Sequence, residues 1–280
     1  MSELQVEFIR STLKLHLSDL SNLHSQIAAK REHNVFLSAI SEEISVMSKL
    51  SRSLTSKLGN KLANVARDLA RSRFGDEAVP RILISSSIDE EIDLQDYDYA
   101  HTDTLVLTNV DQDILETEGQ KLISFAKTSS GKNRIGTESF AEQYLKGLEN
   151  LKRHRVREIS SLRVDLFVDQ FNLGFCELES GGELDTSNVK SQPLKLLKAG
   201  LAYGDVDTAL HFCLSYANNG EGNPIKGGLV NYLTPQSDSE TGDGLLIGSE
   251  WWNSILPDEI EHRKFLQIFK EVTNELEILS

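Results

Sequence analysis

The sequence predicts a mixed α/β fold of α+β type, in which a helical N-terminal region packs on a mixed β-sheet. In the first third of the chain, apolar residues recur at three- and four-residue spacing, as on one face of a helix. Beyond Ser160 this period of about 3.6 residues changes to about 2, the period of a strand with two different faces. The chain has 280 residues, 39% of them hydrophobic, which is enough for a packed core. We expect a helical region over residues 1–80 and a core over 81–280, together forming one compact protein.

The N-terminal region is expected to form two helices. Leucine-rich stripes mark the first over residues 13–27 and the second over 54–69. Gly75 and Pro80 should end the second helix, because neither residue continues a helix well. The next segment, residues 82–110, combines a short apolar run, a dense acidic stretch and the sequence LVLTNV, so we expect strand or loop there.

The C-terminal half is expected to alternate between strands and helices. An amphipathic pattern predicts a helix over 138–157, with a basic cluster at its C-terminal end, where the helix dipole favours cations. Alternating residues around 164–168 and the sequence GFCELES predict two strands joined as a hairpin. Potential capping residues at 185–187 precede a helix to Tyr203, with Pro193 expected near its first turn. Further strands are expected at 210–217 and 245–248, followed by a helix over 257–278.

The charge of the chain is strongly segregated. The net charge is −14, yet residues 30–73 and residues 127–163 each carry nine basic and four acidic residues, while residues 76–121 carry a net −11. Two basic stretches in an acidic chain are candidate contacts to a polyanion, although solvated helix faces would give the same count. The residues that we assign to nucleic-acid phosphates are Arg52, Lys57, Lys132, Arg153 and Arg155.

The sequence contains no sign of a membrane protein or of a disulfide framework. No uninterrupted apolar run approaches the roughly 20 residues that a membrane helix needs, and the start MSELQVEFIR has no basic region followed by an apolar stretch. Cys176 and Cys213 lie in apolar contexts, which is typical of free buried thiols in a reducing compartment. We expect a soluble cytoplasmic protein that does not bind a membrane.

Three carboxylates are candidates for a metal site. Side chains two apart on a strand share a face, so Glu177 and Glu179 should point the same way. A hairpin would bring Asp165, on the preceding strand, beside them. Mg²⁺ prefers oxygen ligands and keeps several waters, so such a group predicts a Mg²⁺ site suited to phosphodiester hydrolysis. The alternative is an ordinary antiparallel strand whose acidic side chains face solvent.

The segment RVDLFVD, followed by ELE and by a helix of the form VKSQPLKLLKAGLA, resembles the core of the PD-(D/E)xK nucleases, most of all type II restriction endonucleases. Asp165 then matches the metal-binding aspartate, and Glu177 matches the acidic residue of the (D/E)xK half-motif. Glu179 stands where most members carry lysine, although some carry Glu-x-Glu. Lys190 or Lys195 could supply a displaced ammonium group, and we include Lys190 among the expected catalytic residues.

Flanking segments extend the resemblance over about residues 50–272. Residues 52–70, 209–228 and 244–256 are similar to segments of enzymes that cut GGNCC-type sites, with Trp251 and Trp252 at the aromatic positions. The resemblance implies a Mg²⁺-dependent, sequence-specific endonuclease for double-stranded DNA, in a prokaryotic restriction-modification system. A palindromic target would imply a homodimer, because each subunit then cleaves one strand.

A second hypothesis belongs to a different class. The chain could be a catalytically silent DNA-binding or regulatory protein that retains the nuclease core, and the missing motif lysine supports this reading. A digest of plasmid DNA with Mg²⁺ separates the two hypotheses, since a protein that only binds DNA produces no fragments.

Overall fold

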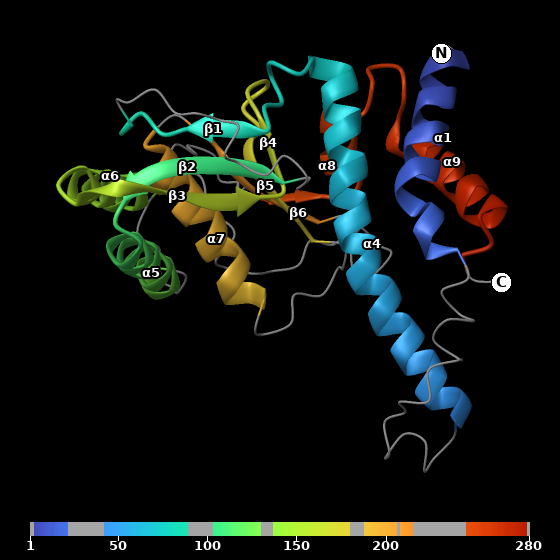
Figure 1. Ribbon diagram of the computed structural model, residues 1–280, viewed down its shortest axis with the longest axis horizontal. Coiled ribbons are helices and arrows are strands. Elements are labelled where there is room, and N and C mark those ends of the chain that lie inside the picture. Colours follow the sequence, from blue (N-terminus) through green and yellow to red (C-terminus); the bar gives the residue numbers. More distant parts are fainter. Residues whose placement is uncertain are drawn as a thin grey trace. The chain divides into compact units, whose positions relative to one another are not determined.

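The computed structural model describes residues 3–21, 42–88, 103–129, 137–179, 188–205, 208–214 and 245–278. It confirms a mixed α/β protein with small mixed sheets (Figure 1). The chain forms two compact units, residues 1–73 with 252–280, and residues 74–251. The division of the chain at residue 80 stays a prediction about domains. None of the described helices is both long and apolar enough to cross a membrane.

The first unit is built from helices. It contains α1 (Glu3–Leu17), the 3-10 turn η1 (Ser18–Leu20), α4 (Glu42–Phe74) up to Arg73, and α9 (His262–Glu275). α1 and α9 lie side by side (Figure 1), and Arg10 forms ion pairs with Glu271 and Glu275 of α9. The expected second helix is confirmed as α4, and Gly75 follows it at φ +87°, a conformation that favours glycine after a helix.

The second unit holds both sheets. The first has the order β1-β2-β3, with β1 parallel to β2 and β2 antiparallel to β3. The second has the order β4-β5-β6-β7, with β4 antiparallel to β5 and the other pairs parallel. The strands are β1 (Ile82–Ile84), β2 (Thr104–Val110), β3 (Arg155–Val164), β4 (Leu166–Val168), β5 (Gly174–Glu179), β6 (Leu210–Leu214) and β7 (Leu245–Ile247). The helices are α5 (Gln112–Ser129), α6 (Thr137–Lys152), α7 (Asn188–Tyr203) and the start of α8 (Ser249–Ile255).

The helix expected over 138–157 is too long. α6 ends at Lys152, and the chain enters β3 at Arg155, so the expected C-terminal basic cluster is divided between a helix end and a strand. The cause is a long antiparallel ladder to β2, in which Val110 pairs with Arg155 and Thr104 with Val164. Pairing with a distant strand outweighs the local helical pattern here.

Several other elements follow the sequence pattern, and two were missed. The hairpin of β4 and β5 is confirmed, and α7 is confirmed over its described residues, although Pro193 lies beyond the first turn of α7. The helices α5 and α8 were not predicted from the apolar pattern. Asp111 gave a signal for α5, since its side chain accepts hydrogen bonds from the first-turn amides of Asp113 and Ile114, at 2.9 and 3.1 Å. The tryptophans of α8 and both cysteines are buried, and the cysteines are free thiols.

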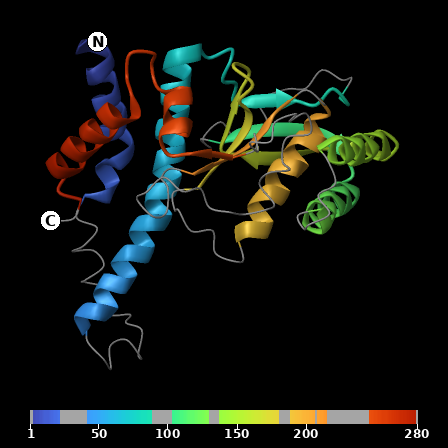
Figure 2. The same ribbon diagram turned by 180° about the vertical axis from the view of Figure 1, so that it is seen from behind.

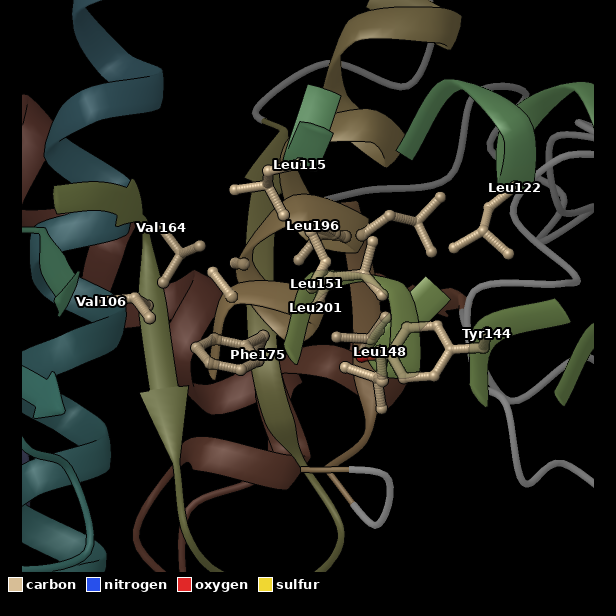
Figure 3. Packing of buried hydrophobic residues seen from close by; sticks show 14 of the residues in the cluster. Val106, Leu115, Leu122, Tyr144, Leu148, Leu151, Val164, Phe175, Leu196 and Leu201 are labelled. Atoms are coloured by element: carbon tan, nitrogen blue, oxygen red, sulfur yellow. The ribbon is translucent and has the colours of Figure 1, made fainter. Parts of the chain in front are cut away.

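Helix α7 is the central packing element of the second unit. It lies against β2, β3, β5 and β6, and α5 and α6 pack beside it (Figures 1 and 2). Leu196 and Leu201 of α7 enter a hydrophobic cluster together with Phe175 of β5 and Tyr144 of α6 (Figure 3). Gly200 allows this close approach, because a Cβ atom there would lie 2.6 Å from the Tyr144 hydroxyl and 2.9 Å from Leu210.

The Tyr144 hydroxyl is buried and has no hydrogen-bond partner among the described residues. We therefore expect Tyr144→Phe to be neutral or to stabilise the protein by up to about 1 kcal/mol, since no hydrogen bond is lost. Gly200→Ala should destabilise it by about 1–3 kcal/mol through overpacking. Urea unfolding followed by circular dichroism measures both effects.

The double variant tests the stated contact. Tyr144→Phe removes the nearer of the two clashing atoms, so Gly200→Ala should cost less in that background. Equal costs of Gly200→Ala in both backgrounds would show that the Tyr144 hydroxyl does not limit the approach of α7.

Candidate functional site

The candidate site begins where the chain passes from one sheet to the other. Asp165 is the single residue between β3 and β4, and Glu177 lies within β5. Leu166 pairs with Cys176 in the antiparallel hairpin, so the next pair outward is Asp165 with Glu177. Asp165 Oδ2 also accepts a hydrogen bond from the Leu178 amide at 2.8 Å. The hairpin thus holds the two carboxylates side by side.

Helix α7 brings the positively charged side chain of a lysine to this pair of carboxylates. The Lys195 ammonium donates a hydrogen bond to Glu177 Oε1 and forms an ion pair with it, and it lies 3.6 Å from Asp165 Oδ1. One turn further along, Lys198 forms a separate ion pair with Glu116 of α5 at 2.6 Å. These two lysines of one helix therefore have different acidic partners, and of the two it is Lys195 that reaches the carboxylates of the hairpin.

Glu177 is a deeply buried acid. Its exposed fraction is 3%, and among the described residues its second oxygen, Oε2, has no hydrogen-bond partner. Burial and the neighbouring Asp165 carboxylate together raise the pKa of Glu177 to about 8, although Lys195 opposes both. Burial alone would lower the pKa of Lys195, but the neighbouring carboxylates, with Glu177 first, outweigh burial and raise it. Below about pH 8, a proton on Glu177 therefore compensates the charge that Lys195 does not neutralise.

The other expected site residues lie partly outside the described structure. Glu179 ends β5 opposite Leu214 of β6, and Lys190 lies in α7, but the positions of both side chains are outside the described part. The same holds for the side chain of Arg52 in α4, and Lys132 lies in the undescribed segment 130–136. The side chains of Lys57, Arg153 and Arg155 are exposed.

The two carboxylates fit a hydrated divalent cation. The described His, Cys, Asp and Glu residues include no group of three or more placed to bind a metal ion. Mg²⁺, however, commonly takes one or two carboxylates and completes its shell with water and substrate phosphate. Asp165 and Glu177 provide such a pair, and Glu177 Oε2 is a buried acceptor that lacks a donor among the described side chains.

The sequence alone could not choose between Lys190 and Lys195. Both lysines lie close in sequence to the leucines of this helix, so the sequence pattern does not say which of them faces the carboxylates. The choice depends on how α7 is rotated, which the buried residues Leu196, Leu197 and Ala199 fix by packing on the sheet.

Comparison of the chain with protein-family models, with curated proteins and with solved structures found no match.

The raised pKa of Glu177 gives a prediction about pH and cations. Between the ordinary glutamate range and about 8, the folded protein binds a proton at Glu177 more tightly than the unfolded chain does. Stability should therefore fall as the pH rises toward about 8. Mg²⁺ competes with this proton, so Mg²⁺ should raise the melting temperature more at about pH 8.5 than at about pH 6.5. Thermal melts at both pH values measure this.

Two variants test whether Glu177 causes the effect. Glu177→Gln should remove the cation-dependent stabilisation and flatten the pH dependence. Glu116→Gln is the matched control, because Glu116 also pairs with a lysine of α7 but lies outside the site, and it should keep both properties. The assignment of Glu177 is wrong if Glu177→Gln retains the response to Mg²⁺.

Proposed function

We propose that this protein is a Mg²⁺-dependent, sequence-specific endonuclease for double-stranded DNA, of restriction-modification type. One observation carries the proposal: a buried carboxylate, Glu177, lies beside Asp165 and a lysine ammonium, at a point where strands of two sheets meet. Two acids and one lysine in such a place suit the hydrolysis of a phosphodiester, whose charge requires cations and whose attacking water requires orientation.

Each residue has a role in this proposal. Asp165 and Glu177 would hold the cation, and Glu179 remains the expected third acidic residue. When bound, a divalent cation would neutralise charge on the scissile phosphate and lower the pKa of a coordinated water. The Lys195 ammonium, which contacts Glu177, would donate hydrogen bonds to the attacking water or to the developing phosphate charge. We now prefer Lys195 to Lys190 for this role, because Lys195 contacts Glu177.

The order of elements supports the resemblance to PD-(D/E)xK nucleases. A strand ends at Asp165, a hairpin leads to the strand of Glu177, and α7 then connects β5 to the parallel strand β6. The segments RVDLFVD, ELE and VKSQPLKLLKAGLA, which carry the resemblance, fall on these elements. A restriction-endonuclease-like fold is therefore part of the proposal.

The proposed partner is double-stranded DNA. Residues 152–158, where α6 ends and β3 begins, are exposed without interruption and include Lys152, Arg153, Arg155 and Arg157. Exposed cations in a chain of net charge −14 are candidate phosphate contacts. A palindromic target would require a homodimer with one site for each strand.

One observation favours the second hypothesis, a DNA-binding protein without nuclease activity. The ion pairs of Lys195 with Glu177 and Asp165 would also be expected in a protein without nuclease activity, where these charges only neutralise each other. The experiment below separates the two hypotheses.

We expect purified protein to cut plasmid DNA into discrete fragments when Mg²⁺ is present. Asp165→Asn, Glu177→Gln and Lys195→Met should each reduce the single-turnover cleavage rate by about three orders of magnitude or more. Specific DNA binding should persist, because none of these residues is assigned to bases or to distant phosphates. Gel electrophoresis and a filter-binding assay measure the two properties.

Lys198→Met is the matched control for Lys195→Met, since both lysines are on α7 and both form ion pairs with glutamate. It should cleave at nearly the wild-type rate. Specific binding without fragments from the wild-type protein would favour the silent DNA-binding hypothesis, and full cleavage by Lys195→Met would remove that lysine from the mechanism.

The phosphate contacts can be tested through salt dependence. Replacing Arg153 and Arg155 with Ala should weaken binding to all DNA sequences about equally. The plot of log K against log salt concentration should become shallower by about one to two units, because each phosphate contact contributes a slope near −0.9. A loss confined to one position of the DNA site would indicate base contacts, and an unchanged slope would place this surface away from DNA.

A further inference from the structure

A third acidic residue lies next to the candidate site, and the motif does not include it. Asp103 directly precedes β2, and Asp165 directly follows β3. Thr104 pairs with Val164 and Leu105 with Arg163 in the antiparallel ladder, so Asp103 and Asp165 occupy the next opposed positions at the end of these two strands. Asp103 is half-buried.

The Lys195 ammonium interacts electrostatically with Asp103 as well as with Asp165 and Glu177. Its ammonium contacts Glu177 and is 3.6 Å from Asp165 Oδ1, and the Asp103 carboxylate adds to the interactions that raise the pKa of Lys195. The strand register places Asp103 opposite Asp165, and Lys195 lies 3.6 Å from Asp165 Oδ1, so Asp103 belongs to the surroundings of this ammonium group.

The charges of this group are unbalanced. Asp103, Asp165 and Glu177 carry three negative charges when ionised, and Lys195 carries one positive charge. With these four groups ionised the net charge is −2, before the expected contribution of Glu179 is added. Glu177 Oε2 is buried and has no hydrogen-bond partner among the described residues, whereas Oε1 contacts Lys195. A cation at Asp165 and Glu177 would have to take these carboxylates from the Lys195 ammonium.

We propose that Asp103 is a positioning residue of the site, which holds the Lys195 ammonium when a divalent cation occupies Asp165 and Glu177. This inference depends on the cation site of the proposed function. In this arrangement the ammonium leaves Glu177 but stays beside the reacting phosphate, because Asp103 retains it at the end of β2. Asp103 thereby removes a competitor of the cation and keeps Lys195 available for catalysis.

A double-mutant cycle on cation affinity tests the proposal without an activity measurement. Free Mn²⁺ is followed by electron paramagnetic resonance during titration of the full chain without DNA. Asp103→Asn should weaken Mn²⁺ binding about tenfold when Lys195 is present, but only about threefold in the Lys195→Met background, where no ammonium needs a second anion. Lys195→Met alone should bind Mn²⁺ more tightly than the wild type.

Two further variants complete the experiment. Asp103→Glu keeps a carboxylate and should bind Mn²⁺ within about threefold of the wild type. Asp113→Asn removes an exposed acid beyond the other end of β2 and should bind like the wild type. Should Asp103→Asn fail to fold, Asp103→Ser serves in the same cycle.

The outcomes separate this inference from the proposed function. Wild-type affinity in Asp103→Asn, or an equal loss in both Lys195 backgrounds, would overturn the role of Asp103 while leaving the cation site in place. If Asp165→Asn and Glu177→Gln bind Mn²⁺ as tightly as the wild type does, the proposed function itself would be contradicted.

Discussion

The cost of burying the Glu177 carboxylate is the constraint on which the arrangement of the site depends. Moving an ionised carboxylate out of water costs several kcal/mol unless an opposite charge or a proton compensates it. In this protein the compensation is incomplete, because Lys195 contacts Glu177 while Asp165, opposite it in the hairpin, adds a second negative charge. Burial and Asp165 together keep the pKa of Glu177 raised despite the lysine. Such a site gains stability from any further cation that fits it, and this is why we interpret it as a site for ligand binding.

The fold places the three groups through a few precise contacts. Asp165 separates β3 from β4, so one residue ends the ladder of the first sheet and begins that of the second. Beneath this junction, Phe167, Phe175 and Tyr203 form a cluster of tilted and edge-on rings that packs the hairpin against the end of α7. Gly200 lets α7 approach α6 and β6 closely, which fixes the helix that carries Lys195. The position of the Lys195 ammonium therefore depends on core packing several residues away from the charged atoms.

The sequence pattern correctly predicted those parts of the site that depend on residues close together in the chain. The alternation around Asp165 and Glu177 predicted the hairpin, because two strands joined by a short turn pair with each other. The end of α6 was predicted wrongly, since β3 is defined by its ladder to β2, and β2 is distant in sequence. Asp103 escaped notice for the same reason: it appeared as one more acid in an acidic stretch. Its position opposite Asp165 follows only from the register of those two strands.

The location of a bound cation tests the central claim most directly. Crystals soaked with Mn²⁺ and measured by anomalous diffraction would show where the ion lies and where the Lys195 ammonium has moved. Our account predicts an anomalous peak within coordination distance of both Asp165 and Glu177, with the ammonium no longer hydrogen-bonded to Glu177. A fully bound Mn²⁺ at another place, with Lys195 still paired to Glu177, would contradict it.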